Sequence, residues 1–397
     1  MKNKGFRSLA PLEEARKKFL KIIKETKESE KIDLEESVDR VSSRDIKAPR
    51  PSPHYDRAAM DGYAVKAKDT FGASSSSPRR LKISRQVEVN DKEAYPISTG
   101  QELPSGADAI LKIENTEKNE RGEIEVLSSV APGEDVAKKG EDVEKNQVIV
   151  KSGTLIRPSH MSLLRNIGIE KIPLKKRPEV AICPTGEELV RPGEKPKPGM
   201  TIESNSLMVK NYVARWGGKP EIYRHFTDEK EILETKLNSF LKTDLIVTIG
   251  GSSVGKRDRL VELVKEKGDI VVHGVAIKPG KPVALGTYES VPIICLPGYP
   301  VATLVDSFFF LKAALQKMLC IQKQDFYREL RLSEKIHSRL GKTTITRVKI
   351  KQDKAHPIRT GGSGILSSVT ESDGFVLVDS SIEGLDKDSI VKVYPWQ

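Results

Sequence analysis

The chain has 397 residues, of which 37% are hydrophobic and 31% are charged, and its formal net charge is +11. That length exceeds what one hydrophobic core usually organises, so we expect about two to four domains. The positive charge raises the question of nucleic acid, but only 5% of the residues are aromatic and the lysines alternate with glutamates. This pattern favours affinity for small anions and argues against a nucleic-acid partner.

The cysteines and the hydropathy pattern exclude further classes. Cys183, Cys295 and Cys320 lie far apart and form no C-x-x-C pair, so we expect neither a zinc site nor a disulfide framework, and a reducing cytosol fits best. The first residues contain no apolar segment of the kind found in signal peptides. The most apolar window, Val291–Phe310, is interrupted by prolines and carries Asp306. We therefore expect a cytoplasmic protein with no membrane partner.

The first predicted elements are helical and the next are strands. Residues 11–28 form a charged amphipathic helix with Leu12, Ala15 and Phe19 on its apolar face. A second short helix around Leu34 leads into a proline-rich segment, where helical structure ends. From about 46 to 146, short alternating runs predict an all-β insertion in which SSSSPRR at 74–80 is a mobile loop.

Helical character returns at residues 159–168, where Ser159 follows Pro158 as the expected cap. From Pro178 strand and helix patterns alternate as far as the helix PVATLVDSFFFLKAALQKML, which predicts a mostly parallel sheet covered on both faces. Strands resume after about residue 325 and predict a small β-barrel or sandwich. The expected fold class is therefore multidomain α/β plus β, with the β segment inserted between two helical pieces of one module.

Three glycine-rich turns mark the stretch 244–300: GGSSVGKRD, IKPGKP and LPGYP, each after a β-branched run. Such a turn presents backbone N–H groups to an anion, and Lys278 and Lys281 bracket the second turn. Gly250–Lys256 satisfies G-x-x-x-x-G-K, but Arg257 stands where an ATPase loop has Ser or Thr. The turns therefore predict a phosphorylated ligand held with a metal, outside the ATPase class.

Five motifs stand out along the chain: AAMDGYAV at 58–65, STG and SGADAI at 98–110, PTGEEL at 184–189, GGSSVGKRD at 250–258, and KPGKP with LPGYP at 278–300. Together and in this order they resemble the molybdopterin molybdenumtransferase family, the MoeA proteins and the related E domain of gephyrin. The resemblance implies four domains: a discontinuous helical dimerisation domain at 1–45 and 147–177, an inserted β domain at 46–146, a three-layer MogA/MoaB-like α/β domain with a parallel-rich sheet that binds molybdopterin at 178–325, and a C-terminal β-barrel domain at 326–397.

The resemblance also implies an enzyme of molybdenum cofactor biosynthesis. Such an enzyme inserts molybdate or tungstate into adenylylated molybdopterin, uses Mg²⁺, and releases AMP. It implies a homodimer whose active site joins one subunit's α/β domain to the other subunit's β domain, with an adenylyltransferase as a further partner. A molybdopterin adenylyltransferase and a catalytically impaired scaffold or carrier stay open as alternatives, and no residue discriminates molybdenum from tungsten.

The candidate site residues follow from the turn chemistry and from the resemblance. Each also has a purely structural alternative, since Asp and Thr are common in turns, Asp often caps helices, and Glu187 and Glu188 could be acids at a helix N-terminus. The candidates are, for catalysis, Asp61, Thr99, Asp228, Lys278 and Lys281; for substrate binding, Thr185, Gly186, Gly250, Gly251, Ser252, Ser253, Pro297 and Pro300; and for the metal, Glu188 and Asp258.

Two positions depart from the family pattern. The family has LPGNP, and this chain has Tyr299 in place of the asparagine. Tyrosine keeps a hydrogen-bonding tip but is bulkier, which affects either the oxyanion geometry or the metal preference. Arg57 stands where a small or amide residue is commoner, and it could bind an anion or lie on the surface.

Overall fold

The computed structural model describes residues 9–223, 229–250, 259–321, 326–358 and 362–396, and the chain divides into two compact units. The first unit comprises residues 1–30, 39–41 and 175–397, and the second comprises 31–38 and 42–174. Within the described ranges, no helix is both long enough and apolar enough to cross a membrane. Each unit is described by itself below.

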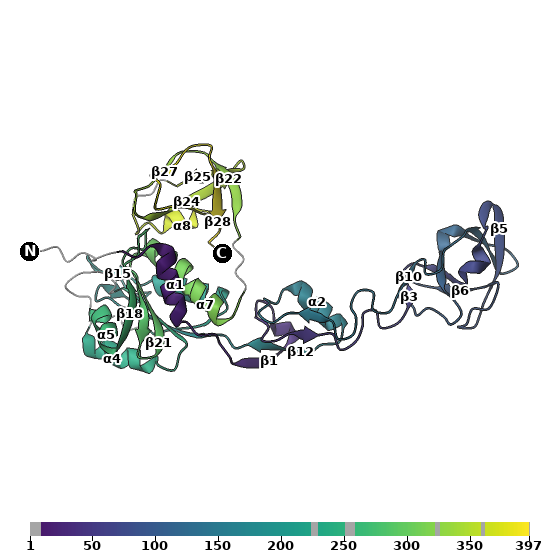
Figure 1. Ribbon diagram of the computed structural model, residues 1–397, viewed down its shortest axis with the longest axis horizontal. Coiled ribbons are helices and arrows are strands. Elements are labelled where there is room, and N and C mark those ends of the chain that lie inside the picture. The colour runs from purple at the N-terminus through teal and green to yellow at the C-terminus, as the bar shows by residue number, and fades with distance from the viewer. Residues whose placement is uncertain (1–8, 224–228, 251–258, 322–325, 359–361, 397) are drawn as a thin grey trace, which may run out of the picture. The chain divides into compact units, whose positions relative to one another are not determined.

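A six-stranded sheet organises the first unit (Figure 1). Its first four strands in spatial order run parallel, and the last two are antiparallel at one edge. The central strand has the sequence LIVTI and is buried at all five positions, as expected for a parallel strand covered on both faces. The spatial order is β16 (Lys219–Ile222), β13 (Glu179–Pro184), β17 (Leu245–Ile249), β21 (Val291–Leu296), β20 (Ala284–Tyr288) and β18 (Gly268–His273).

Helices cover both faces of this sheet, so the predicted three-layer arrangement is confirmed. One face, which includes Ile246 and Ile293, packs against α4 (Lys230–Ser239) and α5 (Arg259–Lys267). The other face is covered by α1 (Leu12–Ile22), α3 (Asn205–Arg215) and the helical segment made of α6 (Pro300–Asp306), the π-helical η4 (Ser307–Leu311) and α7 (Lys312–Met318).

Helix α1 packs in a different place from the one expected. The sequence pattern placed it in a module with residues 147–177, but Leu12, Ala15 and Phe19 are buried in the same core as the α/β sheet. The purple helix lies beside α7 in Figure 1. It ends at Ile22 rather than at residue 28, and β1 (Ser29–Asp33) follows. The four domain boundaries stay a prediction. The packing of α1 shows that its apolar face is buried against the sheet.

The C-terminal strands close into a five-stranded barrel, as the strand pattern after residue 325 predicted. The ring closes because the first strand pairs with the last, and its interior is filled by Val348, Val376 and Val391. A short strand, β19 (Ile277–Lys278), leaves the α/β part and pairs in parallel with the barrel. The barrel order is β24 (Thr343–Lys351), β25 (Lys354–Pro357), β22 (Arg328–Leu332), β28 (Ile390–Tyr394) and β26 (Gly374–Val378), with β23 (Ile336–His337), β27 (Gly384–Leu385) and α8 (Ser367–Thr370) outside the ring.

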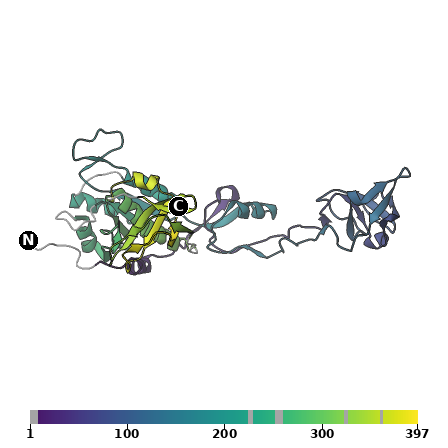
Figure 2. The same ribbon diagram turned by 90° about the horizontal axis from the view of Figure 1, so that it is seen from above.

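The second unit contains a six-stranded sheet, and its blue strands gather into one body in Figure 2. The order is β7 (Ala109–Lys112), β4 (Gly62–Val65), β6 (Glu93–Ile97), β5 (Ser74–Ile83), β9 (Glu123–Ser128) and β8 (Thr116–Lys118). The smaller elements are η1 (Leu34–Glu36), β2 (Ile46–Lys47), β3 (Arg57–Ala58), η2 (Ala67–Thr70), η3 (Ile113–Asn115), β10 (Val136–Ala137), β11 (Val148–Val150), α2 (Pro158–Asn166) and β12 (Lys171–Lys175).

Three local predictions in this unit were wrong. Residues 74–80 belong to strand β5 rather than to a mobile loop, because their backbone pairs with β9 across an irregular register while the side chains stay exposed. Helix α2 begins at Pro158, and its N-cap is Arg157, not Ser159. Proline fits this first helical position because it has no N–H to leave unsatisfied. The short helix expected around Leu34 is a single 3-10 turn.

Candidate active site

Three parallel strands of the first unit end at the same edge of the sheet, and their ends are tied together. The Thr185 N–H donates to the Ile249 carbonyl at 2.8 Å, and the Gly250 N–H donates to the Leu296 carbonyl at 2.9 Å. A Cβ on Gly250 would lie 2.3 Å from the Thr185 carbonyl oxygen, and the φ of Gly250 is +106°. Only glycine fits there. This edge is where open α/β sheets bind their ligands.

The acid at the end of β13 is held close to the same turn. A Cβ on Gly186 would lie 2.7 Å from Glu188 Oε1, so this carboxylate lies against the turn backbone. The segment after Glu188 is β14 (Leu189–Val190), which pairs with β15 (Thr201–Ile202). The alternative that Glu187 and Glu188 are acids at a helix N-terminus is therefore wrong.

The strand ends line a hollow of about 620 Å³, which we call the strand-end pocket. Five of the predicted site residues border it: Thr185, Glu188, Gly250, Pro297 and Pro300. A second acid, Glu203, also lines it, but its carboxylate accepts from the Ser206 N–H at 2.7 Å and from Ser206 Oγ at 2.5 Å. Glu203 is thereby engaged at the start of α3. No motif in the sequence pointed to Glu203 as a site residue.

A second hollow of about 530 Å³, which we call the lysine pocket, lies between the KPGKP turn and the barrel. Lys278 and Lys281 border it, as predicted for an anion site. The C-terminal part of the chain adds His337, Lys342 and Arg347, which sequence reasoning missed. These residues belong to none of the five motifs. The pairing of β19 with β24 brings them close to the KPGKP turn. Its described lining contains several cationic side chains and no carboxylate.

Arg347 is the most buried cation of the lysine pocket, with 6% of its surface exposed. Burial lowers the pKa of its guanidinium from the ordinary value, but arginine remains protonated in proteins. A positive charge in a desolvated wall interacts more strongly with an anion than one in water does. The lysine pocket is therefore built to attract an oxyanion or phosphate.

One side chain beneath this pocket is a buried acid. Asp306 is fully buried, and neither carboxylate oxygen has a hydrogen-bond partner among the described residues. A Cβ on Gly280 would lie 2.3 Å from Asp306 Oδ1, so the acid lies directly against the KPGKP turn. Burial raises the pKa of Asp306 well above its ordinary value. Burial therefore favours the neutral form of this carboxyl group.

The second unit brings two of the predicted catalytic residues together. Asp61 Oδ1 accepts from the Thr99 N–H at 2.6 Å and from Thr99 Oγ1 at 3.1 Å. Gly100 continues the turn, and its N–H donates to the Ala58 carbonyl at 2.8 Å. Both hydrogen-bonded side chains are exposed. Arg57, in β3, is exposed as well. The pair belongs to a different unit from the two pockets.

Five predicted site residues lie outside the described residues: Asp228, Gly251, Ser252, Ser253 and Asp258. The helices that follow these residues are α4 and α5. α4 has Glu229 as its N-cap, and α5 begins at Arg259.

An α/β unit with two pockets at the carboxyl ends of its strands and beside the KPGKP turn, joined to a closed barrel and accompanied by a separate β-rich unit, defines a multidomain α/β plus β protein. Family models match nearly the whole chain: the MoeA N-terminal region (domain I and II) at residues 10–168, the "Probable molybdopterin binding domain" at 181–317, and the MoeA C-terminal region (domain IV) at 329–396.

Individual proteins agree with these matches. A protein of Methanocaldococcus jannaschii whose name assigns it to molybdopterin biosynthesis is 38% identical over 405 residues, covering 98% of this chain and 99% of that protein. The molybdopterin molybdenumtransferase of Bacillus subtilis is 28% identical over 406 residues, covering 98% and 94%. The crystal structure of a MoeA protein from Pyrococcus horikoshii superposes with a TM-score of 0.87 at 32% identity, covering 98% and 100%. The chain belongs to the MoeA family of molybdenum cofactor biosynthesis proteins.

Proposed function

We propose that this chain is a molybdopterin molybdotransferase that inserts the metal of molybdate or tungstate into adenylylated molybdopterin and releases AMP. The observation that carries the proposal is the pair of adjoining pockets, one glycine-walled at the strand ends and one lined by Lys278, Lys281 and Arg347. The substrates and products are all anions. Cleavage of a P–O bond depends mostly on positioning and charge neutralisation.

The two pockets suit different substrates of the proposed reaction. The strand-end pocket, bordered by Gly250 and Gly298, lets the phosphorylated pterin approach the backbone closely, while the cations of the lysine pocket suit the incoming oxyanion. Two unit charges about 4 Å apart are worth roughly 4 kcal/mol at an effective dielectric of 20. Lys278 and Lys281 therefore hold the oxyanion, and Pro297 and Pro300 shape the loop beside it.

Magnesium fits this site as an ion carried mainly by the substrate. Among the described residues, no group of three or more His, Cys, Asp or Glu side chains could hold a metal. Glu188 is the exposed acid of the strand-end pocket, and Mg²⁺ needs only one or two carboxylates together with waters and phosphate oxygens. Bound there, Mg²⁺ neutralises phosphate charge. Asp258 is the second proposed carboxylate.

The two other functions are less well supported. An adenylyltransferase would need only an α/β domain, whereas the matches to MoeA regions at 10–168 and 329–396 extend far beyond it. A carrier would keep the pockets without turnover. Asp61→Ala and Lys281→Ala separate the enzyme from the carrier, because an enzyme should lose AMP release by orders of magnitude. AMP release that is unchanged in both variants would contradict the assigned roles, and no release from the unsubstituted protein would favour the carrier.

We further propose that the enzyme is a homodimer in which Asp61 and Thr99 of one subunit complete the site of the other. Support comes from their exposure and from their location in a different unit from the pockets. Co-expressed Asp61→Ala and Lys281→Ala subunits would then regain about a quarter of full activity, because each mixed dimer retains one intact site. No recovery in the mixed dimer would contradict the shared site. An upstream adenylyltransferase is a further proposed partner.

A further inference from the structure

Tyr299 stands between the two pockets. It borders both the strand-end pocket and the lysine pocket, and 66% of its surface is exposed. Among the described residues that line either pocket, it is the only Phe, Tyr or Trp. A large ring in this position would leave apolar surface in water unless a ligand covers it.

The backbone that carries this ring is held at three consecutive carbonyls. Thr303 Oγ1 donates to the Pro297 carbonyl at 2.6 Å and to the Tyr299 carbonyl at 3.0 Å. Asn205 Nδ2 donates to the Gly298 carbonyl at 2.7 Å. Helix α6 begins directly after Tyr299, with Pro300 in its first turn. The loop is therefore a fixed support, and ordering it costs little when a ligand binds.

The barrel supports the ring from a second direction. The Val301 N–H donates to the Ser363 carbonyl at 3.0 Å, and a Cβ on Gly364 would lie 3.7 Å from Tyr299 Cδ1, at ordinary contact distance. The ring thus packs beside Gly364 while most of its surface stays open. A tyrosine fixed in this way offers a flat face to a ligand without first losing much rotational freedom.

We infer that the Tyr299 ring is the stacking surface for the pterin of the adenylylated substrate and separates that ring from the oxyanion. This inference rests on the proposed function. The metal is inserted at the dithiolene, which lies on the ring fused to the pterin. The pterin, rather than the adenine beyond the diphosphate, is therefore the flat group that comes nearest the lysine pocket. Stacking on an aromatic side chain tolerates any π-face and needs no hydrogen-bond match.

The ring and the hydroxyl of Tyr299 would have chemically different roles. The ring would act on the pterin, whereas the hydroxyl could only donate to an oxyanion or phosphate. The asparagine found in the family pattern can supply a polar tip but no stacking face. Tyr299→Phe keeps the ring and removes the hydroxyl, and Tyr299→Ala removes both. Phe326→Ala is the matched control, since Phe326 is 69% exposed and borders neither pocket.

The experiment measures AMP release by the full-length protein while adenylylated molybdopterin and molybdate are varied separately. Tyr299→Ala should raise the KM for the pterin substrate about tenfold, with kcat and the half-saturating molybdate concentration nearly unchanged. Tyr299→Phe should restore the KM, and Phe326→Ala should match the unsubstituted protein. Quenching of pterin fluorescence on binding should be lost in Tyr299→Ala and kept in Tyr299→Phe.

Several results would overturn the inference. An unchanged KM in Tyr299→Ala would exclude stacking, and a shift only in the molybdate requirement would assign the residue to the oxyanion. A Tyr299→Phe variant as impaired as Tyr299→Ala would make the hydroxyl the functional group. If the unsubstituted protein releases no AMP but its pterin quenching depends on the ring, the proposed reaction fails while the stacking role stands.

Discussion

At the scale of single residues, Asp306 is a costly group for the folded structure to bury. A carboxyl group buried without hydrogen-bond partners costs free energy of folding, and the cost is far larger if the group is charged. Helical spacing puts Asp306 on the same face of α6 as Ala302, which lines the lysine pocket. The acid therefore lies one turn below the pocket floor and in contact with the KPGKP turn.

Asp306 should make stability fall as the pH rises. Burial raises the pKa of Asp306 in the folded chain, whereas in the unfolded chain the acid ionises above its ordinary pKa of 3.8. Between these two pKa values the folded state binds more protons, so the free energy of unfolding decreases by up to about 1.4 kcal/mol per pH unit. Asp306→Asn should flatten this dependence in denaturation midpoints measured as the pH is raised from the ordinary pKa of 3.8. Parallel pH profiles for the two proteins would contradict a neutral buried acid.

Gly280→Ala should destabilise the chain and weaken oxyanion binding. A Cβ there meets Asp306 Oδ1 at 2.3 Å, and the φ of +116° is strained for any other residue. Gly341→Ala is the matched control, because its φ is +78° and nothing lies within 4 Å of the added Cβ. The control should lose about 1–2 kcal/mol, the cost of the left-handed backbone alone, and Gly280→Ala should lose more. Adding Asp306→Ala to Gly280→Ala should recover part of the loss in thermal midpoint, and no recovery would contradict the contact.

At the scale of elements, the site depends on short loops held by hydrogen bonds from neighbouring helices. The strand–helix alternation, the three-layer sheet and the C-terminal strands could be predicted because each has a hydrophobic period of its own. That period left a barrel or a sandwich open, and the family resemblance selected the barrel. The packing of α1 on the sheet could not be predicted, because an amphipathic face does not reveal which partner it meets. The paired strand at 74–80 was also hidden, since backbone pairing gives no signal in a run of exposed serines.

Thr303→Val should loosen the loop that presents Tyr299. The substitution preserves shape but removes the hydroxyl that donates to the Pro297 and Tyr299 carbonyls. Leaving a buried carbonyl unpaired costs about 1–3 kcal/mol, so the thermal midpoint should fall and the KM for the pterin substrate should rise. Thr235→Val is the control, since Thr235 Oγ1 donates to the Glu231 carbonyl at 2.9 Å on the solvent-exposed side of α4. Equal effects of the two substitutions would argue against a role for this tether.

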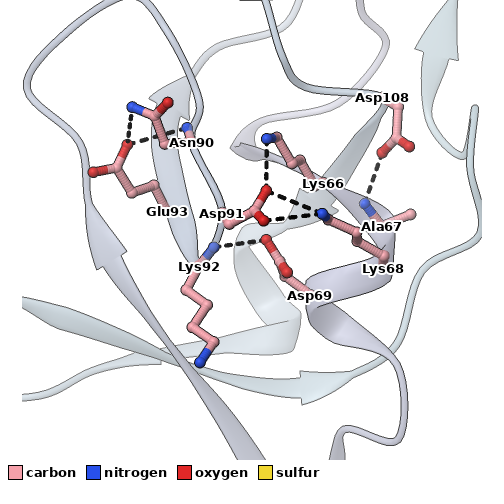
Figure 3. Close-up of polar contacts among 9 residues, drawn as sticks. All are labelled: Lys66, Ala67, Lys68, Asp69, Asn90, Asp91, Lys92, Glu93 and Asp108. Carbon is pink, nitrogen blue, oxygen red and sulfur yellow. Dashed lines mark hydrogen bonds and ion pairs between the residues drawn. The ribbon is translucent and has the colours of Figure 1, made fainter.

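In the second unit, Asp91 links η2 to the loop that precedes β6 (Figure 3). Its carboxylate accepts from Lys66 Nζ at 2.7 Å and from Lys68 Nζ at 3.1 Å, and these bonds lower the pKa of Asp91 to about 2. The stabilisation is present above pH 3.8, the ordinary pKa, and is lost as the pH falls through about 2. Carbon-detected NMR titration should find this low pKa, and Lys66→Met should move it back toward 3.8. An Asp91 that titrates near 3.8 before substitution would contradict the ion pairs.

At the scale of the whole molecule, the motifs identified the family, but only the fold assembled the pockets. Lys278, Lys281, Thr185 and Gly250 could be placed in the site from their turns. His337, Lys342 and Arg347 could not, because they reach the lysine pocket through the pairing of β19 with a barrel strand far along the chain. Asp306 was visible in the sequence as a charge that breaks an apolar window, yet its contact with Gly280 required the packed structure.

The most direct test of the central claim is AMP release from purified adenylylated molybdopterin with magnesium, while molybdate and, separately, tungstate are titrated. A metal-inserting enzyme should show saturable AMP release that depends on the oxyanion, and the more effective oxyanion identifies the metal. Tight binding of the adenylylated pterin without release under either oxyanion would contradict a metal-inserting enzyme and would leave a molybdopterin carrier.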